Sequence, residues 1–152
     1  MFLRNAWYVA AWDTEVTNAP LARTLLDEPV VLFRTQNGRA AALEDRCCHR
    51  YLPLSLGSVI EDELQCGYHG LRFDATGACV AVPGQTKVPP GAKVRSFPVV
   101  ERHGWIWIWM GDPARADATV IPDWWWMDHP DWQVVRGNEG RPLHIKCHYE
   151  LI

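Results

Sequence analysis

The sequence lacks long apolar runs, an excess of positive charge and the common nucleotide and protease motifs. Its longest stretch without Asp, Glu, Lys or Arg is residues 75–86, which contains Pro83 and Gly84, so no segment can cross a bilayer as a helix. The net charge of −3 argues against a nucleic-acid surface. There is no G-x-G-x-x-G, G-x-x-x-x-G-K-S/T or H-E-x-x-H. The N-terminal MFLRN lacks the apolar core of a signal peptide, so we expect a soluble cytoplasmic protein.

The sequence also lacks the even number of cysteines that a complete disulfide set requires. It has five, and a chain of 152 residues buries roughly two thirds of its unfolded surface without a disulfide framework. In a reducing compartment, clustered Cys and His indicate metal binding or catalysis. Nine Trp residues indicate a rigid core and surfaces that are built to be covered.

Short apolar stretches bounded by turn residues make up most of the chain and predict an all-β fold. Asn37-Gly38 lies between two of these stretches and predicts a hairpin, because both residues tolerate positive φ. The predicted strands are residues 7–12, 22–26, 29–35, 39–45, 63–66, 71–73, 78–82, 94–101 and 104–110.

The last of these strands has two apolar faces. At a period of two, Ile106, Ile108 and Met110 fall on one face and three Trp residues fall on the other. We expect the first face to meet the core of the domain. The Trp face is expected to meet either a second domain or another subunit.

Gly111-Asp112-Pro113 marks a boundary, because Gly and Pro end regular structure. Residues 1–113 are therefore predicted to form one domain, and residues 114–152 to lead into another. The run Trp124–Trp126 in this second part is expected to pack rather than to bind substrate. Since the sequence stops within an apolar segment, we expect it to be part of a longer protein.

Two short motifs carry the chemistry. Cys47-x-His49 and Cys66-x-x-His69 each supply one thiolate and one imidazole. A [2Fe–2S] cluster with two Cys on one iron and two His on the other needs this set of ligands. Gly67 permits close approach of the backbone, so that N–H groups can reach the cluster sulfurs.

A structural zinc site is an alternative for the same side chains. Zinc fingers usually pair like with like, whereas each pair here is mixed. Cys48 is a rival thiolate, but adjacent cysteines in a tight turn do not easily face one iron, so we expect a small residue beside the site. Cys79 and Cys147 lie in strand-like stretches and are predicted to belong to the core.

With these residues in view, the sequence resembles a Rieske domain, and more narrowly the N-terminal part of a Rieske non-haem iron oxygenase α subunit of the vanillate demethylase and dicamba monooxygenase group. The resemblance implies the ligands Cys47, His49, Cys66 and His69, and a third loop at Pro83-Gly84 that covers the cluster. It implies the Rieske fold of small antiparallel sheets, followed by the start of a truncated α+β catalytic domain. The matching stretches outside the first loop are NAWYVAA (5–11), CGYHGLRFD (66–74), VPGQ (82–85), VRSFPVVER (94–102), IWIWMGDP (106–113) and HIKCHYELI (144–152).

The resemblance also implies the function. In the family, a reductase or ferredoxin delivers electrons to the cluster, which passes them to a mononuclear Fe(II) that activates O₂, within a homotrimer. The motif that binds this second iron is absent, so we expect the 152 residues alone to be catalytically incomplete. His144, His148 and Glu150 imitate its ligands, but their alternation with apolar residues favours a strand. The alternative function is a stand-alone Rieske ferredoxin, for which residues 114–152 have no use.

The sequence departs from the family pattern at two positions. Cys48 stands where Pro is frequent and Tyr51 where Gly is frequent, and we expect both to alter the shape and exposure of the loop. Arg46 and Arg50 flank this loop, either as docking residues for a reductase or a neighbouring subunit or as solvated surface charges.

The sequence also differs from respiratory Rieske subunits. Leu52 and Tyr68 occupy the positions of their loop-to-loop disulfide, and Leu71 and Phe73 the positions of two hydroxyls. Without those hydrogen bonds the resemblance implies a low reduction potential, roughly −150 mV.

Overall fold

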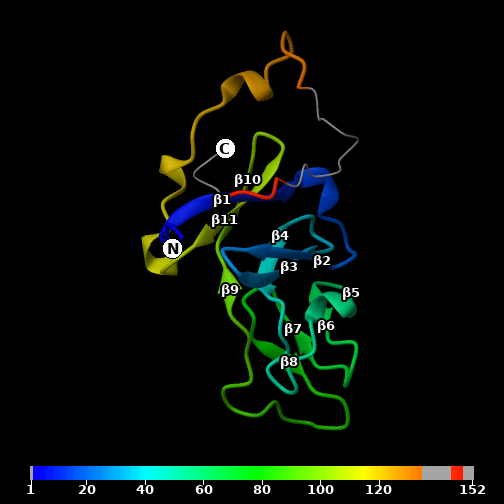
Figure 1. Ribbon diagram of the computed structural model, residues 1–152. Helices are drawn as coiled ribbons and strands as arrows, with labels where there is room; N and C mark the ends of the chain where they lie inside the picture. Colours follow the sequence, from blue (N-terminus) through cyan, green and yellow to red (C-terminus); the bar gives the residue numbers. More distant parts are fainter. Residues whose placement is uncertain (1, 135–144, 149–152) are drawn as a thin grey trace.

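The computed structural model of the chain describes residues 2–134 and 145–148. Within these residues, all strand pairing is antiparallel and the only helices are short 3-10 turns. Figure 1 shows three small sheets arranged along the long axis of the molecule. The strands are β1 (Ala6–Trp12), β2 (Leu21–Leu25), β3 (Glu28–Arg34), β4 (Ala40–Glu44), β5 (Ser58–Ile60), β6 (Glu63–Gln65), β7 (Arg72–Phe73), β8 (Cys79–Ala81), β9 (Ser96–Phe97), β10 (Val99–Arg102) and β11 (Trp105–Met110).

The strand orders are β1-β11-β10, β2-β3-β4-β9 and β5-β6-β7-β8. The predicted all-β fold is confirmed, and so is the hairpin at Asn37-Gly38, where Gly38 has φ +82°. The prediction of one strand over 94–101 is wrong. Pro98 has no N–H for a ladder, and at this residue the chain leaves β4 in the middle sheet and joins β11 in the outer sheet. The sequence patterns also missed β5.

The middle sheet separates two apolar cores. Along β3, Val31 and Phe33 face the core shared with β5–β8, whereas Val30 and Leu32 face the core shared with β1 and β11. All four side chains are fully buried, and each contributes about 1.5–3 kcal/mol on burial. Strand β3 is therefore buried on both faces and separates the two cores.

The inward face of strand β11 is confirmed, whereas its Trp face, expected to meet a second domain or another subunit, is covered in part from within the same sheet. Ile106, Ile108 and Met110 lie in the core with β1 and the middle sheet. The Trp face is covered by other Trp residues of the chain: Trp7 packs edge-on against Trp109 at 5.4 Å between ring centroids.

Residues 113–132 contain η3 (Pro113–Arg115), η4 (Ala118–Val120) and η5 (Trp125–Met127), and this segment packs back onto the hairpin of β10 and β11. His103, between β10 and β11, holds it there. The buried imidazole lies 2.6 Å from Asp128 through Nδ1, and its Nε2 accepts the Trp124 N–H at 3.1 Å. Of the predicted Trp run, Trp124 packs on β11, while the next two Trp side chains remain exposed.

The expectations of a strand and of a buried Cys147 in the C-terminal segment are wrong, and two other residues singled out there lie outside the described residues. Residues 145–148 form no strand, since no described strand pairs with them, and Cys147 is exposed rather than part of the core. His144 and Glu150 lie outside the described residues, and His148 is exposed. None of the helices within 2–134 and 145–148 has the length and apolar character that crossing a bilayer requires.

Candidate metal centre

The first predicted loop follows β4 and closes on itself. The Cys47 N–H donates to the Leu52 carbonyl at 2.9 Å, and the Tyr51 N–H donates to the Cys47 carbonyl at 2.9 Å. Tyr51 has φ +61°, the left-handed conformation that glycine adopts most readily. The departure from Gly at this position therefore leaves a tight turn intact and adds an exposed side chain.

The second loop follows β6 and closes in the same way. The Cys66 N–H donates to the Leu71 carbonyl at 2.8 Å, and the Gly70 N–H donates to the Cys66 carbonyl at 3.1 Å. Gly67 and Gly70, which lie next to the candidate ligands of this loop, have no space for a larger residue. A Cβ on Gly67 would lie 2.8 Å from the Leu56 carbonyl oxygen, and a Cβ on Gly70 would lie 3.0 Å from Cγ of Pro83.

The two loops bring the two thiols together in the interior. Cys47 and Cys66 are each 2 % exposed and belong to the core between the middle sheet and β5–β8. Burial raises the pKa of Cys47 to about 11. A hydrogen bond with the backbone of His49 lowers this pKa, and the adjacent Cys66 thiol raises it further. In the cluster-free chain Cys47 is therefore a neutral thiol near pH 7, and any metal ion that binds it must displace its proton.

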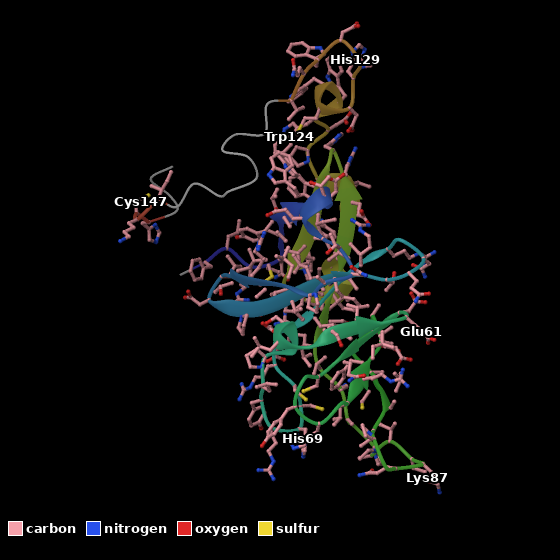
Figure 2. All side chains as sticks on the ribbon, turned by 90° about the vertical axis from the view of Figure 1, so that its right-hand side faces the viewer. Glu61, His69, Lys87, Trp124, His129 and Cys147 are labelled. Atoms are coloured by element: carbon pink, nitrogen blue, oxygen red, sulfur yellow. The ribbon has the colours of Figure 1, made fainter. Side chains whose placement is uncertain are left out.

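The two imidazoles lie together at the surface. The rings of His49 and His69 are 4.7 Å apart between centroids, and both residues are exposed. The Tyr68 ring stacks on His69 at 3.7 Å. Figure 2 places His69 near the end of the molecule opposite Trp124. The site therefore has a buried sulfur half and an exposed nitrogen half.

This division in two fits a two-iron cluster better than a single metal ion. Among residues 2–134 and 145–148, no three Cys, His, Asp or Glu side chains gather closely enough to hold one ion. The predicted third loop also lies at the site, since Pro83 lines a cavity of about 540 Å³ together with His49 and His69. Cys48, predicted to lie beside the site, is half-buried at the rim of the same cavity, and Cys79 is buried as predicted.

Sequence patterns missed the residue that fixes the first loop. Asp45 is buried, and its carboxylate accepts the Ser55 N–H at 2.7 Å and the Ser55 hydroxyl at 2.6 Å. This contact ties the entry of the first loop to η2 (Leu54–Leu56). Nothing in the local pattern predicts it, although an acidic residue two positions before a candidate ligand is a signal worth testing.

An all-β domain with two Cys/His loops at one end, thiols inside and imidazoles outside, defines an iron–sulfur protein of the Rieske type. Residues 6–98 match the Rieske [2Fe-2S] domain family, and the chain belongs to it.

Several relatives are oxygenase components. The chain is 52% identical over 153 residues to the iron-sulfur subunit of the toluene-4-sulfonate monooxygenase system of Comamonas testosteroni, covering 100% of this chain and 43% of that protein. It is 50% identical over 152 residues to the oxygenase component of dicamba O-demethylase of Stenotrophomonas maltophilia, covering 99% of this chain and 44% of that protein. The crystal structure of dicamba monooxygenase bound to dicamba superposes with a TM-score of 0.82 at 52% identity, covering 85% of this chain and 39% of that one. The chain thus spans less than half the length of these relatives.

Proposed function

We propose that the chain is the electron-transfer domain of a Rieske non-haem iron oxygenase that acts on an aromatic ring or removes an O-methyl group. The observation that carries the proposal is the pairing of two buried thiols with two exposed imidazoles at one end of the fold. The relatives support it, since they are named as oxygenase or iron-sulfur components of multi-component systems.

In this proposal Cys47 and Cys66 hold one iron, and His49 and His69 hold the other. When bound, the [2Fe–2S] cluster supplies a one-electron store whose reduced state is centred on the iron that carries imidazoles. The buried thiols keep water from the sulfur half. The exposed imidazoles present their second ring nitrogen to a partner at the surface, which is where an electron has to enter and leave.

Residues 1–113 are proposed as the cluster-binding domain and residues 114–152 as the lead-in to a catalytic domain. The mononuclear iron would be held by residues outside the 152, and a reductase or ferredoxin would supply electrons to a cytoplasmic homotrimer. The alternative of a stand-alone ferredoxin is disfavoured by residues 113–132, where Trp124 packs against Trp105 at 4.9 Å and the following Trp side chains remain exposed.

The test is anaerobic assembly of the chain with iron and sulfide. We expect a red-brown protein with two irons per chain, a Rieske-type electron paramagnetic resonance spectrum after one-electron reduction, and a potential near the low end of the Rieske range, roughly −150 mV. His49→Cys should retain some cluster while lowering the potential and shifting the spectrum. A colourless zinc protein, or a spectrum that His49→Cys leaves unchanged, contradicts the ligand assignment.

A further inference from the structure

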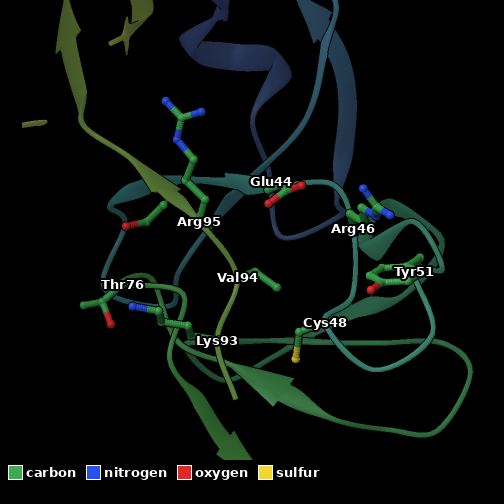
Figure 3. Close-up of a pocket in the computed structure, with 9 residues that line it drawn as sticks. Glu44, Arg46, Cys48, Tyr51, Thr76, Lys93, Val94 and Arg95 are labelled. Atoms are coloured by element: carbon green, nitrogen blue, oxygen red, sulfur yellow. The ribbon is translucent and has the colours of Figure 1, made fainter. Parts of the chain in front are cut away.

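A second cavity, of about 660 Å³, opens on the other side of the first loop (Figure 3). Its wall is built from the end of β4, the first loop, the turn between β7 and β8, and the approach to β9. Cys48 lines both this cavity and the one beside the histidines, so the two openings are neighbours. The lining residues are Glu44, Arg46, Cys48, Tyr51, Thr76 and Lys93–Ser96.

The cavity is basic, although the chain as a whole is acidic. Arg46, Lys93 and Arg95 line it, against the single carboxylate of Glu44. Arg95 already has an ion-pair partner, because its guanidinium lies 2.8 Å from the Glu28 carboxylate. In Figure 3 the side chain points away from Cys48. Within the part of the chain that the structure describes, neither Arg46 nor Lys93 forms an ion pair.

The rim of this basic pocket has the composition of a protein interface. The Arg46 guanidinium lies 4.0 Å from the centre of the Tyr51 ring, and Tyr51 is 63 % exposed. Tyr68, stacked on His69, is 60 % exposed, so aromatic side chains flank the histidine edge. Tyr and Arg are the residues most enriched in the parts of interfaces that carry binding energy.

We propose that the basic pocket docks an acidic surface of the protein that donates electrons to this domain, with Arg46 and Lys93 as the charged contacts. This inference rests on the proposed electron-transfer function. Exposed cations in water contribute little by themselves, but they steer an oppositely charged partner and fix its orientation. The neighbouring cavity contains His49 and His69, so a donor docked on the basic pocket lies beside the exposed imidazole edge.

The chemistry of the pocket fits a protein surface better than a small anion. Arg46 and Lys93 are both exposed, and Glu44 lies in the same cavity, so a free anion would remain largely solvated there. An extended acidic surface can contact both cations at once and can also reach the exposed Arg50 next to the loop.

The experiment uses the cluster-loaded chain and, as the probe, a reduced acidic [2Fe–2S] ferredoxin in stopped-flow mixing. We expect the double variant Arg46→Glu/Lys93→Glu to lower the second-order rate constant of cluster reduction about tenfold or more at low ionic strength. The salt dependence of that rate constant should also be lost. Reduction by a small uncharged reductant should be unchanged.

The matched control is Arg115→Glu, an exposed charge on η3 outside the pocket, which should leave the rate constant within about twofold of the wild type. Lys93→Gln serves as a second variant, because Lys93 lies away from the ligand loops in sequence and reports on docking even if the change at Arg46 disturbs cluster binding.

Equal rate constants for the pocket variants and the control overturn the docking inference while leaving the proposed function intact. A change in sedimentation of the chain without a change in electron transfer also overturns it, since the pocket would then contact a second copy. If the wild-type chain holds no reducible cluster, the proposed function itself has failed.

Discussion

The two ligand loops have different motifs and the same backbone. In each, the N–H of the Cys donates to the carbonyl five residues later, and the N–H four residues later donates back to the Cys carbonyl. The residue four positions after the Cys is left-handed in both loops, with φ +61° at Tyr51 and φ +73° at Gly70. The spacings C-x-H and C-x-x-H therefore place two histidines at successive positions of one kind of turn, and bring their rings to 4.7 Å.

The loops differ in the space around them. In the first loop, Cys48 and Tyr51 carry side chains that line the basic pocket. In the second, the matching positions are Gly67 and Gly70, where an added Cβ would meet Leu56 or Pro83. The side chains at these two positions of the first loop extend into a cavity, whereas the backbone of the second loop lies against Leu56 and Pro83, so equivalent substitutions should have unequal effects.

The largest effect is expected at the sulfur half of the site. Cys66→Ala should abolish cluster assembly, because it removes one of the two thiolates that the proposed ligand set places on the same iron. Cys48→Ala, one residue from Cys47 but half-buried at a cavity rim, should retain the full iron content. Iron analysis and visible absorption check both, and a colourless Cys48→Ala protein would show that the loop binds iron through the other thiol.

Gly67→Ala tests the close approach of the second loop to Leu56 directly. Its Cβ would lie 2.8 Å from the Leu56 carbonyl oxygen, a backbone atom that cannot simply rotate away. We expect a loss of about 3 kcal/mol in the free energy of unfolding, typical of severe overpacking. Cys48→Ala at the matching position should cost less than about 1 kcal/mol. Urea unfolding measures both, and equal losses would remove the asymmetry between the loops.

Asp45→Asn tests how the first loop is tied at its entry. Asp45 precedes Cys47 by two residues, and the matching residue before Cys66 is Leu64, which is buried in the core. An amide cannot accept both Ser55 hydrogen bonds with the strength of a carboxylate, so we expect a loss of about 2 kcal/mol. Urea unfolding and the rate of cluster loss to a chelator check the result. Unchanged values would mean that the first loop keeps its conformation without the contact to η2.

These contrasts also mark what the sequence can reveal. The candidate ligands stand out because Cys and His recur at short spacing, and the strands were predictable because alternation reports local burial. The exchange of sheets at Pro98, the short β5 and the contact of Asp45 with Ser55 depend on segments that meet only in the folded chain. The different spacings C-x-H and C-x-x-H likewise cannot show that both turns share one backbone conformation.

Gly70→Ala and Tyr51→Gly compare the left-handed positions. Alanine at φ +73° costs about 1–2 kcal/mol, and its Cβ would also press on Pro83 at 3.0 Å. Tyr51→Gly should be nearly neutral, because the relief of a similar strain offsets the loss of about 0.5–1 kcal/mol from the contact with Arg46. Thermal unfolding of the cluster-free chain separates the two. A large loss for Tyr51→Gly would mean that the Arg46 contact, and not the turn, orders the first loop.

The last prediction concerns the protonation of the first loop. The pKa of Cys47 is raised from 9.0 to about 11 in the folded cluster-free chain, so folding favours the neutral thiol. The resulting stability is fully present below pH 9 and is lost as the pH rises towards 11. Urea midpoints of the cluster-free chain should therefore fall between pH 8.5 and 10.5, and Cys47→Ser should flatten that fall because serine does not titrate there. Cys147→Ser is the control at an exposed cysteine, and it should retain the wild-type slope. If Cys147→Ser flattens the curve as much as Cys47→Ser does, burial at the sulfur half is not what keeps the thiol protonated.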